Sequence, residues 1–250
     1  MIRQRFSMFD GIGPKREQAI RDAGVSDWRG FLDAHEVSGL SEPRRRLLRG
    51  EVRTWSNALD QGDAAFFARN VPRAEHWMLF EAFGDSVRYL DIETTGLSSY
   101  YHDLTVVGIH DGSDFRALVQ GRDLTEQALR DALDGCKLLV TYFGSSFDVP
   151  FLSVNFPNVR WDFPHFDLCF AGRRVGLTGG MKGVERTLGI ARDRSVVEVD
   201  GFEAVRLWRA YERGSDAALK KLLTYNEADT RNLAQMAAAI YERLCRKGGA

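Results

Sequence analysis

Two acidic residues within an apolar run constrain the fold of this 250-residue chain more than any other feature. Residues 87–93 (VRYLDIE) have the composition of a β-strand, and Asp91 and Glu93 lie two positions apart within it. Because side chains alternate along a strand, both carboxylates should point to one face of the sheet while Leu90 and Ile92 point to the other. Burying two carboxylates is costly unless they are paired or bind a metal. The pattern therefore predicts a metal site, or alternatively an edge strand whose acids are solvated.

The apolar patterns around this strand predict an α/β fold with a mixed sheet. Further strands are expected at 104–110 and 115–119, joined around an Asp-Gly turn, and at 137–143. Helices are expected over 123–133 (begun by a capping box at Asp123 and Glu126), 149–155, 181–188, 202–213 and 216–243. Strands in hairpin order, followed by alternating strands and helices, indicate a sheet flanked by helices.

The N-terminal third lacks strand signals and is expected to be a small all-α region. Residues 1–35 predict two short helices around a glycine turn, and residues 41–60 a third helix, capped by Ser41, with Leu48, Val52, Trp55 and Leu59 on its apolar face. We expect a helical module over 1–60, a helical connector over 61–85 and an α/β domain over 86–245.

Composition narrows the class of protein. The chain is 44% hydrophobic and 28% charged, as in ordinary globular proteins, and no run of about 18 apolar residues predicts a membrane span. Three scattered cysteines favour a reducing, cytoplasmic location over a disulfide framework. The net charge of −1 argues mildly against nucleic-acid binding, but residues 41–53 and 172–186 are locally basic. Each basic cluster is expected either to contact phosphates or to form a solvated helix face.

Two further acids and a tyrosine downstream complete the candidate site. Asp148 follows the expected strand 137–143 across a short loop, where it also suits the N-cap of the next helix. Tyr225 and Asp229 are four residues apart on one expected helix and so share a face. Each has an ordinary structural explanation when considered singly. Together with Asp91 and Glu93 they give the order DxE, FD, YxxxD, which is far more specific.

These motifs resemble the three exonuclease motifs of the DEDD 3′→5′ exonucleases, in the tyrosine subclass of the ribonuclease-H-like superfamily. The matching runs are DIETTGL at 91–97, FD at 147–148 and YNEAD at 225–229. The runs TYFGSSFDVPFL at 141–152, HFDL at 165–168 and KGVE at 182–185 are similar to the YprB-type branch. The chain departs from the family at Phe143, where an asparagine is usual, which leaves the acids intact and affects contacts to the terminal nucleotide.

The resemblance implies a two-metal mechanism, and the chemistry of the acids agrees with it. Two Mg²⁺ or Mn²⁺ ions suit a cage of hard oxygen ligands and assist phosphodiester hydrolysis. Asp91 would bridge both ions, Glu93 and Asp229 would complete one site, and Asp148 would hold the other ion. Tyr225 would orient the attacking water, because a pKa of about 10 makes tyrosine a poor base at neutral pH. The resemblance also implies contacts of Leu97 and the Thr95 backbone with the terminal nucleotide.

The N-terminal run FDGIGPK at 9–15 resembles the hairpin of a helix-hairpin-helix motif. Its Gly11–Gly13 turn would expose backbone N–H groups at a helix N-terminus, a favourable place for a phosphate, and Lys15 adds positive charge. The motif implies contact with the nucleic-acid backbone, and it favours single-stranded DNA over RNA as the substrate. A purely structural turn between two helices is the alternative.

Three other functions remain open at this level. The same fold could act as an exoribonuclease, or it could be a binding protein with a vestigial site. A ribonuclease-H-type endonuclease fits less well, because such sites place their first two acids on different strands. His165 and Asp167 are expected to be structural or to lie near the substrate groove, with a further metal site as the alternative. His102, beside Tyr100 and Tyr101, is expected to line the nucleotide site without a catalytic role.

Overall fold

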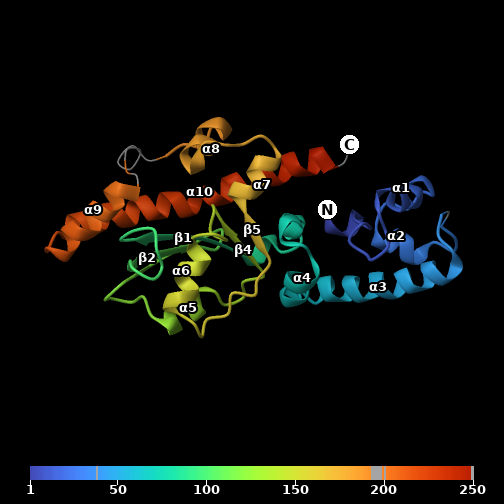
Figure 1. Cartoon of the computed structure of the whole chain (residues 1–250), viewed down its shortest axis with the longest axis horizontal. Coiled ribbons are helices and arrows are strands. Elements are labelled where there is room, and N and C mark those ends of the chain that lie inside the picture. Colours follow the sequence, from blue (N-terminus) through green and yellow to red (C-terminus); the bar gives the residue numbers. More distant parts are fainter. Residues whose placement is uncertain (38, 193–198, 200, 249–250) are drawn as a thin grey trace.

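A five-stranded mixed sheet forms the centre of the larger part of the molecule (Figure 1). The computed structural model describes residues 1–37, 39–192, 199 and 201–248. The strands are β1 (Val87–Thr94), β2 (Leu104–His110), β3 (Phe115–Val119), β4 (Leu138–Thr141) and β5 (His165–Asp167). Their order is β3-β2-β1-β4-β5, with β1 antiparallel to β2 and parallel to β4. The expected α/β class and mixed sheet are confirmed.

Helices cover both faces of this sheet (Figure 1). The long helix α10 (Asp216–Gly248) crosses one face, and α5 (Glu126–Ala132) and α6 (Asp148–Asn155) cover the other. Leu90 and Ile92 are buried with Phe151 of α6 in the core on that second face. Three further helices pack along α10: α7 (Leu168–Arg174), α8 (Gly180–Leu188) and α9 (Gly201–Glu212). The alternation of β1 therefore turns its acids toward α10, as the sequence predicts.

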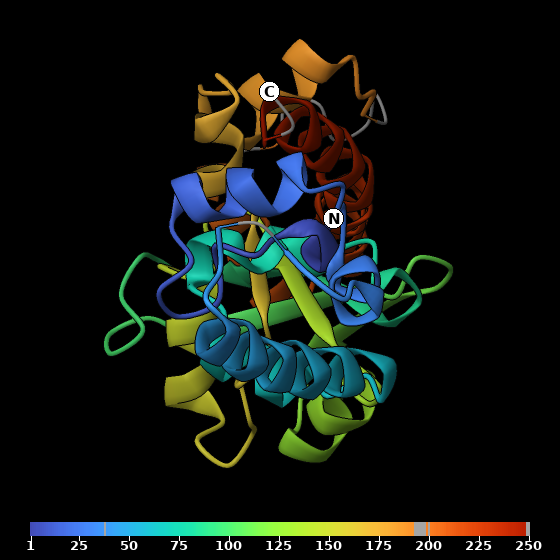
Figure 2. The same ribbon diagram turned by 90° about the vertical axis from the view of Figure 1, so that its right-hand side faces the viewer.

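The N-terminal region is helical, as expected, and is built around aromatic side chains. It comprises the 3-10 turn η1 (Ile2–Gln4) and the helices α1 (Pro14–Asp22), α2 (Trp28–Asp33) and α3 (Glu42–Asp60). The ring of Trp55 on α3 lies 5.2 Å from Phe9 and 6.0 Å from Trp28, between ring centroids. Figure 2 views the molecule from this end, with α3 and the shorter helices in front of the sheet.

The connector joins the two regions through a shared core. It contains α4 (Ala64–Asn70) and the 3-10 turns η2 (Arg73–Leu79) and η3 (Gly84–Ser86). One buried apolar cluster extends from Phe6 and Val52 in the N-terminal region to Ile240 and Leu244 on α10. Glu81 adds polar contacts by accepting 2.8 Å hydrogen bonds from the N-terminal ammonium group and the Tyr241 hydroxyl. The helical region is thus packed against the α/β domain.

Several details differ from the sequence prediction. Strand β4 ends at Thr141 because the chain then turns toward α6, and β5 and α7 were not anticipated. The prediction of a helix cap at Asp123 is wrong: Thr125 caps α5, accepting from the Ala128 amide, while Asp123 accepts from Val119 and closes the turn after β3. None of the helices in the described residues is both long enough and apolar enough to cross a membrane.

The arginines of residues 41–53 help to hold the N-terminal region together. Arg44 and Arg45 donate to the carbonyl oxygens of Asp10 and His35, and Arg49 donates to Leu32 at 3.0 Å. These guanidinium groups satisfy carbonyls of the segment before α1, the end of α2 and the loop between α2 and α3. Part of this basic cluster is therefore structural.

Candidate active site

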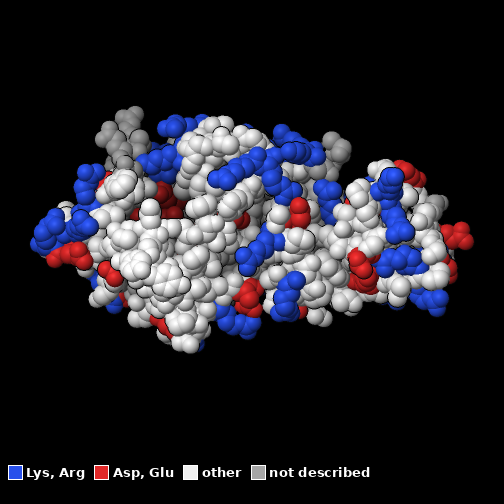
Figure 3. Space-filling model, in the orientation of Figure 1, with Lys and Arg blue, Asp and Glu red and all other residues white. Residues whose placement is uncertain are grey.

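A cleft of about 850 Å³ opens where β1 ends. Its walls come from the last residues of β1, the turn after it, α9 and α10. The lining includes Asp91, Glu93, Thr95, Leu97, Tyr225 and Asp229. Strand β1 thus meets two helices more than 100 residues further along the chain, at a depression that Figure 3 shows as a recess with acidic atoms at its base.

The fold brings together the four acids predicted from the sequence. Glu93 is 7% exposed, Asp148 is 4% exposed and Asp229 is 5% exposed, so three of the carboxylates are buried in the described structure. Asp148 begins α6 and reaches β1, where the Ile92 amide hydrogen-bonds its carboxylate. The other three carboxylates are all close enough to Asp91 to raise its pKa. The alternative of an edge strand with solvated acids is excluded, because β1 is central in the sheet.

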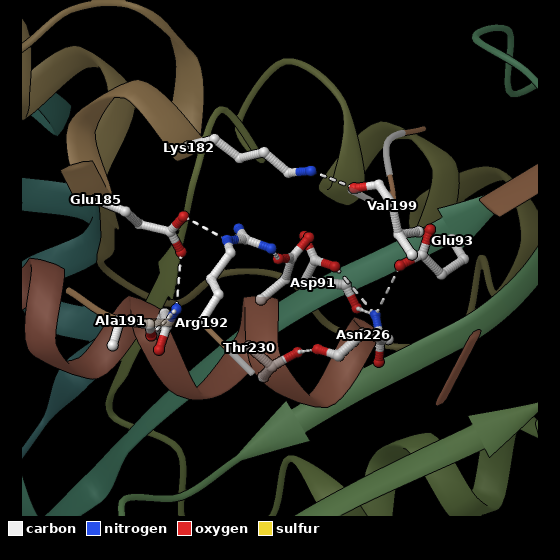
Figure 4. Close-up of polar contacts among 11 residues, drawn as sticks. Asp91, Glu93, Lys182, Glu185, Ala191, Arg192, Val199, Asn226 and Thr230 are labelled. Atoms are coloured by element: carbon white, nitrogen blue, oxygen red, sulfur yellow. Dashed lines mark hydrogen bonds and ion pairs between the residues drawn. The ribbon is translucent and has the colours of Figure 1, made fainter. Parts of the chain in front are cut away.

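Asn226 on α10 connects the two acids of β1 (Figure 4). Its Nδ2 atom donates to Asp91 Oδ2 at 3.0 Å and to Glu93 Oε1 at 3.4 Å. A side-chain amide gives the carboxylates hydrogen-bond donors without adding a positive charge. Asn226 was part of the quoted YNEAD run, but no role was predicted for it; its place between Tyr225 and Asp229 could have signalled one.

Gly108 on β2 allows α10 to approach this closely. It lies opposite Asp91 in the antiparallel register of β1 and β2. A Cβ atom at Gly108 would lie 2.0 Å from Asn226 Oδ1 and 2.6 Å from Thr230 Oγ1. Such distances are sterically impossible without movement, so glycine is required for this helix to lie directly on the sheet.

Burial and mutual repulsion raise the pKa values of the acids. The pKa values of Asp91 and Glu93 lie well above their usual range, chiefly through burial and then through the charge of Asp229. Burial raises the pKa of Asp148 to about 7. The pKa of Asp229 is also raised by burial, although Arg192 opposes this shift. Carboxylates that repel one another in this way are stabilised as anions by a nearby cation.

Tyr225 lies beside these acids and stays protonated. It is 8% exposed, and its side chain is hydrogen-bonded to that of Asp229. Burial, followed by the negative charge of Asp229, raises the pKa of the phenol far above its ordinary value. A hydroxyl held in this form can donate a hydrogen bond, but it is not a base at neutral pH.

Arg192 supplies a positive charge at one side of the cluster (Figure 4). Its guanidinium contacts Asp229 and also pairs with Glu185 of α8, at 2.5 Å between Nε and Oε2. Glu185 in turn accepts from Asn232 of α10 at 2.8 Å. Arg192 and Glu185 have side chains 7% and 2% exposed, so this is a buried network. Glu185 belongs to the KGVE run noted in the sequence, whereas no sequence motif includes Arg192.

The carboxylate and amide oxygens of the cleft are suitable ligands for a divalent cation, although they are not yet arranged around a common centre. Within the described part of the chain, no three His, Cys, Asp or Glu side chains are placed to hold a metal ion as they stand. One buried oxygen, Asn226 Oδ1, has no hydrogen-bond partner, and Asp229 Oδ1 is paired with Arg192. Carboxylate and amide oxygens are the ligands that Mg²⁺ and Mn²⁺ prefer. The residues therefore fit such an ion once Asp229 turns from Arg192 toward the other acids.

The residues predicted to contact the nucleotide lie at the mouth of the cleft. Leu97 is 86% exposed there, an unusual position for a large apolar side chain outside a binding surface. The Thr95 amide already donates to the Asp103 carbonyl, so of its two backbone groups the carbonyl oxygen is the one that a ligand could contact. His102 packs its ring against Gly96 and does not line the cleft. Sequence reasoning missed the opposite wall, formed by α9 with Phe202, Arg206 and Arg209.

His165 and Asp167 organise the loop that precedes Asp148. Asp167 accepts hydrogen bonds from the Phe143 and Ser145 amides at 2.9 and 3.0 Å, and from the Ser145 hydroxyl at 2.6 Å. His165 lies 2.8 Å from the Thr141 hydroxyl through Nε2. The structural interpretation of this pair is therefore favoured over a metal-binding one.

Comparisons with known proteins agree with this architecture. A family model described as the RNase H superfamily matches residues 88–241, more than half of the chain. No curated protein matches the chain in sequence.

Solved structures show the same fold at low sequence identity. Brucella melitensis NrnC has a TM-score of 0.50 and 22% identity, covering 68% of this chain and 78% of that one. Its form bound to pGG has a TM-score of 0.50 and 21% identity, with the same coverage of each chain. The family B DNA polymerase of Pyrobaculum calidifontis has a TM-score of 0.51 and 16% identity, covering 62% of this chain and 24% of the polymerase.

Proposed function

This chain belongs to the RNase H superfamily, and from this premise we propose that it is a metal-dependent exonuclease that removes nucleotides from the 3′ end of single-stranded DNA. The observation that carries the proposal is that Asp91, Glu93, Asp229 and the protonated Tyr225 line one cleft, with Asp148 close enough to Asp91 to raise its pKa. The structure of NrnC with pGG supports the choice of a single-stranded ligand. The tyrosine subclass and the YprB-type branch remain part of the proposal.

The acids would hold two divalent ions. Asp91 would contribute to both sites, Glu93 and Asp229 would complete one, and Asp148 would serve the other. Ions bound there supply positive charge for the attacking and leaving oxygens of phosphodiester hydrolysis. Asn226 keeps the carboxylates of Asp91 and Glu93 oriented through its two hydrogen bonds.

Tyr225 would position the attacking water. Its hydroxyl donates to Asp229, so the phenol oxygen is left to accept a hydrogen bond from the water. Holding a nucleophile in the reactive orientation contributes to rate without any proton transfer to the tyrosine. Leu97 would pack against the terminal base at the mouth of the cleft, and the Thr95 carbonyl would contact the same nucleotide. Arg206 and Arg209 of α9 would face its phosphates.

The N-terminal turn would add a second contact with the nucleic-acid backbone. Gly11 has φ +67°, and Gly13 directly precedes α1, which begins with Pro14. Lys15 is exposed in the first turn of this helix. An N-terminal turn of this shape offers N–H groups and the positive end of the helix dipole to a phosphate.

This contact is best tested with point substitutions, because the N-terminal helices share a core with the α/β domain. Lys15→Gln in the full chain should weaken binding of single-stranded DNA and reduce the slope of log affinity against log salt by about 0.7 per lost phosphate contact. Arg29→Gln, an exposed substitution on α2, is the control. Equal slopes for both variants would make the turn a structural element.

A digestion assay tests the exonuclease itself. Single-stranded DNA and RNA of the same sequence, labelled at the 5′ end, are incubated with the full chain in Mg²⁺, Mn²⁺ or EDTA. The proposal predicts a ladder that shortens from the 3′ end with either ion, none in EDTA, and faster loss of DNA than of RNA. Products of internal cleavage, or intact substrate under all conditions, would contradict it.

A further inference from the structure

A second hollow, of about 460 Å³, lies on the other side of the loop that carries Asp148. Its lining includes Ser145 of that loop, Arg73 and Trp77 of η2, and Phe170 and Arg174 of α7. Ser145 and Ser146 face this hollow, whereas Phe147, the next residue, lines the acidic cleft. We call the second depression the basic hollow. It neighbours the candidate active site but is separate from it.

The charge around the basic hollow is positive. Arg73, Arg173 and Arg174 are exposed, and among the acids of the described residues only Glu75 pairs with one of them, at 3.1 Å from Arg174. Arg174 also borders an adjoining depression with Arg243 and Lys247 near the end of α10. Figure 3 shows Lys and Arg side chains gathered over this part of the surface, to the right of the recess that contains the acids. A chain with a net charge of −1 thus concentrates positive charge next to its acidic cleft.

Two exposed aromatic rings accompany these arginines. Phe143 and Phe170 are each 42% exposed, and their ring centroids are 5.7 Å apart with planes at 38°. The Arg173 guanidinium lies over Phe170, 5.4 Å from its centroid. Phenylalanine rings left in water beside arginines are typical of surfaces on which bases of a single strand stack.

The backbone holds Phe143 in this exposed place at a conformational cost. Phe143 has φ +67°, and no other non-glycine residue of the described chain has a positive φ. A bulky residue adopts this conformation only where its surroundings impose it, and such strain is concentrated at functional sites. The Phe143 amide donates to Asp167, and the Gly144 amide donates to Thr141 Oγ1 at 3.0 Å. These bonds fix the loop with Phe143 outside and Asp148 inside.

We propose that the basic hollow binds an upstream nucleotide of a single-stranded nucleic acid whose 3′ end lies in the acidic cleft. Its base would stack on the Phe143–Phe170 pair, and its phosphate would be held by Arg73 and Arg174. The inference rests on the proposed function, which places the end of the strand in the cleft. It adds a second site, formed by η2, α7 and the loop before α6, that a strand of only two nucleotides would not reach.

Binding measurements with two lengths of strand test this site. The full chain is titrated, in EDTA to prevent hydrolysis, into a labelled dinucleotide and into labelled DNA and RNA decamers, and fluorescence anisotropy is recorded. The variants are Phe170→Ala and Arg73→Gln, which change two residues that line the basic hollow. The matched control is Arg116→Gln, an exposed arginine on β3 at the opposite edge of the sheet.

We expect the wild type to bind the decamers more tightly than the dinucleotide. Phe170→Ala should weaken decamer binding about tenfold, as loss of base stacking does on single-strand binding surfaces, and Arg73→Gln should reduce the salt dependence of decamer binding. Dinucleotide binding should change less than about twofold, and Arg116→Gln should alter neither. Thermal melting of each variant checks that the loop is intact.

Three results would overturn the inference: decamer and dinucleotide binding with equal affinity, variants that bind decamers like Arg116→Gln, or variants that weaken both lengths equally. The last result would mean that the loop acts on the cleft alone. A chain that shows the expected length dependence but cleaves nothing in Mg²⁺ or Mn²⁺ would contradict the proposed exonuclease and leave the basic hollow supported. Cleavage of the substrate, with no effect of the variants on decamer binding, would support the exonuclease and contradict the basic hollow.

Discussion

The acidic cleft and the basic hollow lie on either side of one short loop and handle charge in opposite ways. In the cleft, Glu93, Asp148 and Asp229 are buried, so each carboxylate affects the others. In the hollow, Arg73 and Arg174 are exposed, so water and salt screen them from each other. Substitutions in the cleft should therefore have large, non-additive effects, whereas substitutions in the hollow should have smaller, nearly additive effects.

The largest expected effect is that of Asp91→Ala. This change removes the acid proposed to serve both ions, and hydrolysis should fall by about 1000-fold or more, the upper end for loss of one transition-state contact. The melting temperature of the metal-free protein should not fall, because one of four mutually repelling acids is gone. Single-turnover digestion and thermal melting measure both. Near-wild-type hydrolysis by a folded variant would refute the site.

Arg192→Met tests whether the cleft depends on its internal cation. The change leaves Glu185 and Asp229 buried without their partner, and removing one member of a buried pair costs about 3–5 kcal/mol. Chemical denaturation in EDTA should show this loss, and added Mg²⁺ should recover part of it. Arg246→Met breaks an exposed pair with Glu242 and should cost at most about 1 kcal/mol. Equal losses for the two variants would remove the contrast between buried and exposed charge.

Tyr225→Phe removes a single hydroxyl from the cleft. Turnover at saturating substrate should fall about 100-fold, the order expected when a reacting group is misplaced, while metal binding is retained. The wild-type rate should show no basic limb that reports ionisation of Tyr225, because its pKa is far above the usual value. Comparing kcat and metal affinity of the two proteins measures the effect. Unchanged turnover would assign Tyr225 a packing role.

A smaller effect is expected in the pH dependence of stability, through Asp148. Its pKa is about 7 in the fold and 3.8 ordinarily, so the folded state binds the extra proton. The stability that this provides is fully present below about pH 4 and is lost as the pH rises toward 7. In EDTA, the melting temperature should therefore fall over this range by several degrees more in the wild type than in Asp148→Asn. Mg²⁺ should abolish this difference between the two proteins. Melting temperatures that fall in parallel with pH in EDTA would contradict the prediction.

The sequence was sufficient for the features that depend on local periodicity. Alternation in β1 correctly predicted that Asp91 and Glu93 share a face and that Leu90 and Ile92 enter the opposite core. The strands at 104–110 and 115–119 have the predicted bounds. These elements are specified by their own residues, so no tertiary information was needed.

Features that depend on contacts between distant segments could not be predicted in this way. Arg192 lies outside every motif, and its role exists only because α8 and α10 bring Glu185 and Asp229 to it. Strand β5 is three residues long and is defined by pairing with β4, so it has no period of its own. The departure at Phe143 was visible in the sequence, but its positive φ and its contact with Phe170 were not.

Gly108 has a further consequence for the candidate active site. Because it lets α10 lie against β2, the distance between a helix layer and a sheet layer determines how far Asn226, Tyr225 and Asp229 stand from the acids of β1. A methyl group at this position would displace three functional side chains together, although it touches no substrate and carries no charge. The spacing between α10 and the sheet therefore sets the distances within the candidate site, and Gly108, which has no side chain, determines that spacing.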